Sequence, residues 1–228
     1  MQKKILVVVA HPDDESFGLG GTLAKYAKEG VEIHVLCATR GENGQKGSKL
    51  GQKREQELLT ASKTLGVARV EFMDFVDGTL SNNMYHEMAA KVEAKIKPFA
   101  PQVVLTFDRL GISGHIDHIV VSLATTFVCQ KYKRKLKLFY LCELKKFTDL
   151  IPGYFIYFPP GHLDTDIDVT IDISQVWQIK KQAMYVHKTQ IGDVRRLLLV
   201  KRLFPKREYF IEVFKKDKQK LRSDFFGA

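Results

Sequence analysis

The stretch Lys4-Ile-Leu-Val-Val-Val-Ala10 is a continuous apolar run in which β-branched residues dominate. A run of this kind predicts a strand buried on both faces, as strands are in a parallel sheet covered by helices. Residues 16–28 follow with a helical pattern, and Gly30 marks the end of the predicted helix. A buried strand followed at once by a helix is the beginning of a βαβ unit.

The same alternation of strand and helix continues along the chain. Further buried strands are predicted at residues 31–38, 70–73, 103–107 and 138–142, a glycine-rich loop at 39–51, and helices at 52–65, 82–97 and 116–129. Elements at this spacing predict a parallel sheet whose right-handed crossovers place helices on both faces. The predicted fold class is therefore α/β, a three-layer sandwich with a mainly parallel sheet.

The pattern changes after Pro152. Short β-like runs at residues 154–158 and 167–171 precede a predicted helix at 175–187 and a last β-like run at 209–214. A chain of 228 residues is one large domain or two small ones. We interpret residues 1–228 as a single domain, with a parallel α/β core at 1–151 and an α+β extension at 152–228 packed on that core.

Composition excludes several classes of protein. Hydrophobic residues make up 45% and charged residues 27% of the chain, which is typical of a globular protein and not of a disordered or collagen-like one. No apolar run reaches the roughly 18 residues of a transmembrane helix, and the run at 5–10 is too short for a signal peptide. Cys37, Cys129 and Cys142 form no CxxC pair, so we expect buried thiols in a reducing cytoplasm.

The net charge of +10 is concentrated in the second half of the chain. Residues 1–114 contain 15 basic and 14 acidic side chains, whereas residues 115–228 contain 21 and 12. Such an excess is compatible with an anionic substrate, an anionic surface or nucleic acid, and equally with a solvated face. A nucleic-acid-binding module would need aromatic residues among the basic ones, for which Tyr132, Phe204 and Tyr209 are the candidates.

A first cluster of polar residues, His11-Pro-Asp-Asp-Glu15, follows the first predicted strand directly. In open α/β sheets, ligands bind beyond the carboxyl ends of the strands, at the point where the strand order reverses. Acids before a helix can also serve as caps. That role accounts for one or two of the carboxylates but not for the histidine.

A second cluster, Gly114-His-Ile-Asp-His118, follows the fourth predicted strand and begins a helix. His115 and His118 are three residues apart and share a helix face. If the first and fourth strands are neighbours, the two clusters face each other. Two imidazoles and one carboxylate are a common set of catalytic zinc ligands, and they also suit non-haem Fe(II).

Together, Ala10-His-Pro-Asp-Asp-Glu15, Gly20-Gly-Thr22 and Gly114-His-x-Asp-His118 resemble the PIG-L/LmbE family of zinc-dependent N-acetyl-sugar deacetylases. Weaker similarities extend over most of the chain. The resemblance implies a Rossmann-like sandwich and assigns site residues. The implied metal ligands are His11, Asp14 and His118, the implied general base is Asp13, the oxyanion stabiliser is His115 with Asp117 orienting it, and the substrate-binding residue is Arg54.

The resemblance implies a metal-dependent hydrolase that removes acetyl from an N-acetylglucosamine-type conjugate by attack of metal-bound water. Zinc is the expected metal, with Fe²⁺ or another divalent ion as alternatives. A small-molecule conjugate, with anionic ones among the candidates, is the expected partner; nucleic acid is not expected, and a homo-oligomer is left open. The alternative functions are hydrolysis of another amide or ester at the same site and, less favoured, a basic nucleic-acid-binding module. Ser113 stands where some members carry a tyrosine that assists the oxyanion, and Ile116 replaces a frequent proline.

Overall fold

The computed structural model describes residues 2–44, 49–151, 157–215 and 220–227. Within these ranges seven strands form one sheet in the order β3-β2-β1-β4-β5-β7-β6. The strands are β1 Lys4–Val9, β2 Glu32–Cys37, β3 Arg69–Phe72, β4 Val103–Phe107, β5 Lys137–Cys142, β6 Val169–Asp172 and β7 Arg207–Glu212. The strands from β1 to β5 are parallel, and β7 is antiparallel to both β5 and β6.

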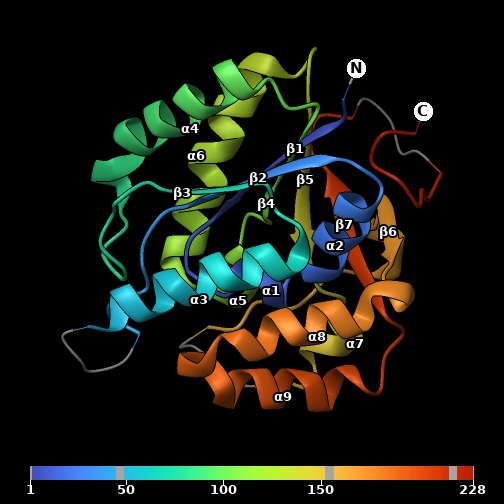
Figure 1. Cartoon of the computed structure of the whole chain (residues 1–228). Coiled ribbons are helices and arrows are strands. Elements are labelled where there is room, and N and C mark those ends of the chain that lie inside the picture. Colours follow the sequence, from blue (N-terminus) through green and yellow to red (C-terminus); the bar gives the residue numbers. More distant parts are fainter. Residues whose placement is uncertain (1, 45–48, 152–156, 216–219, 228) are drawn as a thin grey trace.

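Helices cover both faces of the sheet (Figure 1). One layer contains α2 Gly20–Lys28, α3 Leu50–Leu65 and α8 Trp177–Val186, and the other contains α4 Tyr85–Phe99 and α6 Ile116–Tyr132. α9 Ile191–Lys201 packs beside α8. The remaining elements are single turns: α1 Asp14–Phe17, α5 Gly111–Gly114, α7 Lys145–Thr148, η1 Asn82–Met84, η2 Asp164–Asp166, η3 Ser174–Val176 and η4 Lys188–Gln190. The predicted three-layer α/β fold with a mainly parallel sheet is confirmed.

β1 lies in the middle of the sheet because every side chain in it can be buried. Residues 5–9 have no exposed surface, and β1 pairs with β2 on one side and β4 on the other. The strand order therefore reverses between β1 and β4, which is where α/β sheets leave a crevice for ligands. The expected neighbourhood of the first and fourth strands is confirmed.

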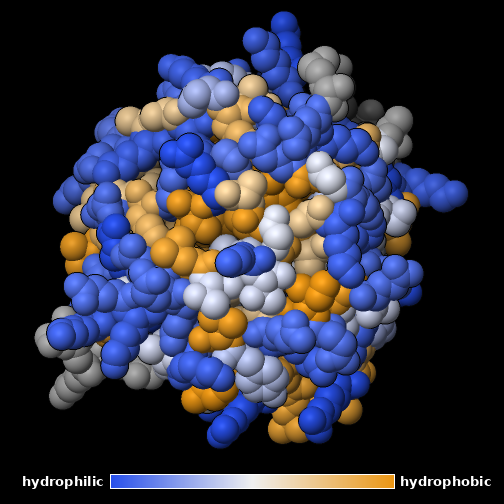
Figure 2. Space-filling model, in the orientation of Figure 1, coloured by the Kyte–Doolittle hydropathy of each residue, from blue (hydrophilic) through white to orange (hydrophobic). Residues whose placement is uncertain are grey.

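Apolar residues form the interior of the protein. The core is one large cluster of buried apolar residues, and Cys37, Cys129 and Cys142 are buried free thiols. Figure 2 shows hydrophilic residues around most of the outline of one face, with hydrophobic residues between them nearer its centre. Among the described residues, no helix is both long and apolar enough to span a membrane.

Several predicted elements differ from the observed ones. The helix expected at 16–28 is divided: α1 ends at Phe17, and α2 begins at Gly20 after Leu19, whose φ of −110° departs from the helical value. The helix α4 passes through Pro98 and ends at Phe99, since a proline in the last turn removes one hydrogen bond only.

The largest omission is α9, since no element was predicted at residues 191–201. The 3.6-residue period was present there, because Val194 and Leu198 are four residues apart and bury one face of the helix against Met184. The β-like run expected at 154–158 lies mostly outside the described residues, and its last two residues form no strand.

A buried ion pair connects the C-terminal part of the chain to α2, the helix that leads from β1 to β2. The Glu208 carboxylate, on β7, accepts hydrogen bonds from the backbone N–H groups of Gly21 (2.9 Å) and Thr22 (2.7 Å). It thereby satisfies amides in the first turn of α2, where no side chain within the helix caps them. Lys180 of α8 donates to the same carboxylate at 2.6 Å, and both side chains are at most 2% exposed.

We expect Glu208→Gln to lower the free energy of unfolding by about 3 kcal/mol, because it leaves the buried Lys180 ammonium without its counter-charge. Urea denaturation measures this change. The matched control is Lys146→Gln, which breaks a solvent-exposed ion pair with Asp164 and should cost less than about 1 kcal/mol. Equal costs for the two variants would contradict the anchoring role of the buried pair.

Candidate active site

The loop after β1 has a tightly fixed shape. Asp13 has a φ of 125°, a conformation that L-residues rarely adopt. The Asp14 carboxylate turns back and accepts hydrogen bonds from the backbone N–H groups of Ala10 (3.2 Å) and His11 (2.7 Å). Because of this turn, the two adjacent aspartates have different partners.

Three predicted metal ligands lie together beyond the carboxyl ends of β1 and β4. His11 Nδ1 lies 3.1 Å from His118 Nε2 and 3.8 Å from Asp14 Oδ2, and His118 Nε2 lies 3.4 Å from Asp14 Oδ1. His118 donates its Nδ1–H to the carbonyl oxygen of Gly111 at 3.0 Å, which leaves Nε2 as the ligating atom. Burial lowers the pKa of His118 to about 4, so its imidazole is neutral.

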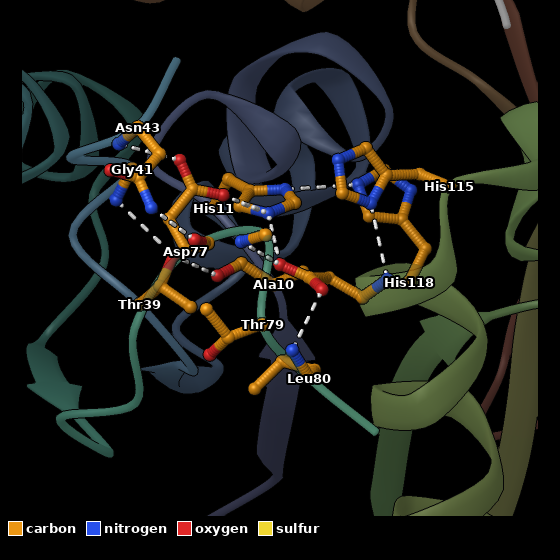
Figure 3. A network of polar contacts seen from close by, with 12 residues as sticks. Ala10, His11, Thr39, Gly41, Asn43, Asp77, Thr79, Leu80, His115 and His118 are labelled. Carbon is orange, nitrogen blue, oxygen red and sulfur yellow. Dashed lines mark hydrogen bonds and ion pairs between the residues drawn. The ribbon is translucent and has the colours of Figure 1, made fainter.

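The other nitrogen of His11 faces two carboxylates (Figure 3). His11 Nε2 lies 3.0 Å from Asp77 Oδ1 and 3.1 Å from Asp117 Oδ2. Burial alone would lower the pKa of His11, but hydrogen bonds to Asp117 and Asp77 and the charge of Asp14 raise it to about 10. A histidine ligand whose second nitrogen contacts a carboxylate is the usual arrangement at a metal.

Two overlapping groups of described residues could hold a metal ion: His11, Asp14 and His118, or His11, Asp77, His115 and Asp117. The first group is favoured by the positions of its atoms. All three of its members line a cavity, whereas Asp117 does not. The oxygens of Asp117 also accept from the backbone N–H groups of Gly78 (2.8 Å) and Leu80 (3.2 Å). The donor set His11, Asp14 and His118 therefore fits a divalent metal.

Asp117 contacts two histidines through different groups. Its carboxylate contacts the His11 ring at 3.1 Å. What reaches His115 is the backbone N–H of Asp117, which donates to His115 Nδ1 at 3.1 Å. The reason is that His115 is the N-cap of α6, so its ring bends back onto the first turn of the helix.

Asp77 is a site residue that the sequence analysis missed. It comes five residues after β3 and three after Asp74, outside the motifs that the sequence analysis singled out. The only signal was its place after a predicted parallel strand. Its Oδ2 accepts the backbone N–H of Asn43 at 3.1 Å, so the loops after β2 and β3 hold each other beside His11.

Asp13 is fixed by Arg54. The buried guanidinium donates to Asp13 Oδ2 at 2.9 Å, to the carbonyl of Pro12 at 2.7 Å and to the carbonyl of Gly41 at 3.0 Å. Burial raises the pKa of Asp13 to about 7, with the Arg54 charge opposing the rise. Arg54 also lines the cavity, but the hydrogen bonds that the structure shows for it hold the loops and Asp13 in place.

A second buried pair of side chains, Glu15 and His187, holds the strained turn at Asp13 in place. The backbone N–H of Asp13 donates to Glu15 Oε2 at 3.0 Å, and Glu15 Oε1 lies 2.8 Å from His187 Nε2. Both side chains are fully buried, and His187 follows the last residue of α8. Residues of the C-terminal part thus contribute to the shape of the β1 loop.

One cavity of about 570 Å³ is lined by His11, Asp13, Asp14, Arg54, Asp77, His115 and His118, among others. Among the described residues around it, five acids stand against three bases: Asp13, Asp14, Asp77, Glu143 and Asp193 against Arg54, Arg196 and Lys201. The basic excess of the second half of the chain is therefore not concentrated in the cavity, and an anionic substrate remains a prediction without support from the lining.

Comparisons with known proteins identify relatives of this chain. Residues 6–129 match the PIG-L family, described as GlcNAc-PI de-N-acetylase. A 1D-myo-inositol 2-acetamido-2-deoxy-alpha-D-glucopyranoside deacetylase of Actinosynnema mirum is 32% identical, with 82% of this chain and 81% of that protein covered. The protein of the same name from Rhodococcus jostii is 30% identical, with 83% and 82% covered.

Solved structures share the fold. The N,N'-diacetylchitobiose deacetylase of Pyrococcus horikoshii superimposes with a TM-score of 0.65 at 19% identity, covering 92% of this chain and 84% of that one. GalB, the 4-carboxy-2-hydroxymuconate hydratase of Pseudomonas putida, gives a TM-score of 0.73 at 21% identity, covering 96% and 100%. Because the hydratase shares the architecture, the fold alone does not assign a reaction.

We expect Asp77→Asn to weaken Zn²⁺ binding by about 10- to 100-fold, since it removes a charged partner of the His11 ring. Competition with a chromophoric chelator measures the affinity. Asp74→Asn, at an exposed carboxylate three residues earlier, is the control and should bind Zn²⁺ as the unmodified chain does. Equal affinities for both variants would show that Asp77 does not support the ligand.

Proposed function

The chain belongs to the PIG-L family, and from this membership we propose that it hydrolyses the acetamide of an N-acetylglucosamine-type sugar conjugate, releasing acetate. The observation that supports this most directly is the set of two imidazoles and one carboxylate beside a second carboxyl group. The four side chains belong to His11, Asp14, His118 and Asp13, and they line one cavity at the β1/β4 crevice. These are the parts that a metal-assisted amide hydrolysis needs.

His11, Asp14 and His118 would hold the metal, which we propose to be zinc, with Fe²⁺ as the alternative. A divalent metal at such ligands supplies Lewis acidity and lowers the pKa of a bound water to about 7. The chain's own contribution is to orient the ligands and, by burial, to keep the His118 imidazole neutral. The Gly111 carbonyl orients His118, and the carboxylates of Asp77 and Asp117 orient His11.

Asp13 is the proposed proton acceptor. Its carboxyl is one residue from a metal ligand and lines the same cavity, and Arg54 holds one of its oxygens. A carboxyl with a pKa near 7 takes a proton from water more readily than an ordinary aspartate does. After the carbon–nitrogen bond breaks, the same proton is available for the departing amine.

His115 is the proposed stabiliser of the oxyanion. Because its Nδ1 accepts the backbone N–H of Asp117, the ring proton resides on Nε2, which then acts as a hydrogen-bond donor. Burial lowers the pKa of His115, so the ring is neutral and this tautomer is the relevant one. A donor of this kind stabilises the negative charge that develops on the acetamide oxygen.

Hydrolysis of another amide or ester by the same groups is the second candidate, since nothing in the mechanism requires a sugar. The nucleic-acid-binding alternative is disfavoured by two of its aromatic residues. The Tyr132 hydroxyl donates to Glu93 and the Phe204 ring packs edge-on against Phe147, so neither ring is presented as a stacking platform.

Detection of free amine across a panel of N-acetylated sugars and simple N-acetyl amides, with added Zn²⁺, tests the function. Release from glucosamine derivatives is the expected result. Release only from simple amides would assign the second candidate, and no release from any compound by metal-loaded protein would overturn the proposal.

Substitution of each of the two adjacent aspartates, Asp13 and Asp14, separates the roles proposed for them. Asp13→Asn should retain the metal and lower kcat by about 10²- to 10⁴-fold, the usual contribution of a general base. Asp14→Asn should weaken metal binding, and its activity should recover in part with excess metal. Metal stoichiometry and rate, measured on both variants, decide the matter. The assignment is wrong if Asp13→Asn loses the metal while Asp14→Asn retains it.

A further inference from the structure

The cavity has two chemically different sides, and the sheet order separates them. On the side of β2 and β3 its lining is polar, with Asn43, Arg54 and Asp77. On the side of β5 its lining contains six large apolar side chains, from α1, the end of β5, α7, α9 and the residues at 151 and 158. We name these side chains the apolar wall: Phe17, Leu141, Phe147, Ile151, Phe158 and Leu197. Beside them lie six polar or charged ones: Glu143, Thr148, Gln190, Asp193, Arg196 and Lys201.

We propose that the apolar wall binds the aglycone of the sugar conjugate, and that this aglycone is a neutral, apolar group such as an alkyl chain or an aromatic ring. The inference rests on the proposed function, because the acetamide must lie at His11, Asp14 and His118. The sugar then extends from the ligands toward one side of the cavity. Among the described lining residues, most of the large apolar side chains lie on the β5 side.

The charges on the β5 side are compensated. Lys201 Nζ donates to Glu143 Oε1 at 2.7 Å and lies 4.3 Å above the ring of Phe147. Asp193 and Arg196 add one charge of each sign. A negatively charged aglycone would therefore meet as many carboxylates as cations, and it would have to give up water without gaining net attraction.

The hydroxyl of Thr148, on this side of the cavity, is also engaged within the protein. The Thr148 hydroxyl donates to the carbonyl of Lys145 at 3.0 Å and accepts the backbone N–H of Gly161 at 2.9 Å. A polyol, such as the inositol in the names of the curated relatives, would place hydroxyls against carbon without replacing their hydrogen bonds to water. An alkyl or aryl group gains by burial at the same surface.

Four α-glycosides of N-acetylglucosamine test the inference, with methyl, octyl, 7-carboxyheptyl and myo-inositol aglycones. Release of free amine by zinc-loaded protein gives kcat/KM for each, with octyl glycoside kept below its micelle concentration. We expect the octyl compound to exceed the methyl one by about tenfold or more. The kcat/KM of the carboxyheptyl and inositol compounds should exceed that of the methyl compound by far less than tenfold, or not at all.

Two leucines of α9 provide matched variants. Leu197→Ser removes part of the apolar wall and should lower the octyl-to-methyl ratio of kcat/KM by about fivefold. Leu199 lies on the same helix and is 63% exposed, so Leu199→Ser should leave the ratio unchanged. Using a ratio cancels any difference in the fraction of folded enzyme.

The outcomes distinguish this inference from the function on which it rests. Deacetylation of all four glycosides at similar kcat/KM, or a preference for the inositol or carboxyheptyl compound, would overturn the apolar aglycone while the deacetylase function stands. No amine from any of the four would overturn the deacetylase function and this inference together. A lowered ratio in both leucine variants would show that α9 as a whole, and not the wall, determines the preference.

Discussion

The parallel pairing of β1 with β4 is the constraint on which the rest of the site depends. Residues 5–7 of β1 align with 103–105 of β4, so both strands end at the same edge of the sheet. Each is followed by its histidine-bearing segment within a few residues. Two clusters more than a hundred residues apart in the chain thereby reach hydrogen-bond distance, with His11 Nδ1 and His118 Nε2 at 3.1 Å. The pairing is possible because both strands are apolar on both faces and can be buried between two helical layers.

A strained turn is the second requirement, and distant parts of the chain maintain it. A non-glycine residue at the φ of Asp13 costs about 1–3 kcal/mol, so its neighbours must hold it there. Glu15 accepts its backbone N–H, and His187 fixes Glu15 from the end of α8. The Lys180–Glu208 pair fixes α8 in turn. The last third of the chain is therefore part of the catalytic architecture, although the residues proposed to do the chemistry all lie before it.

The parts of this arrangement that the sequence predicted are those encoded locally. Continuous β-branched runs predicted the buried strands, and clustered histidines and acids at strand ends predicted which residues meet. The contacts that were missed depend on loop conformation. Asp77 is one of two acids in the loop after β3, and its position beside His11 depends on how that loop folds back. The partner of the Asp117 carboxylate is set by two backbone N–H groups, at 78 and 80, that no periodicity reveals. α9 was missed because charged residues interrupt the short series of apolar residues at helical spacing.

The charge balance around His11 explains why the carboxylates can be gathered so closely. Asp14, Asp77 and Asp117 all lie within 4 Å of a nitrogen of this one ring. Three buried negative charges repel one another strongly, and a single imidazolium compensates only one of them. A divalent cation held by His11, Asp14 and His118 would compensate two, and the carboxylates beside Nε2 would then stabilise the ring as a ligand instead of as a cation. The same carboxylates that raise the pKa of His11 would therefore strengthen the proposed metal site. The excess of negative charge in this cluster thus supports the proposal that it holds a cation.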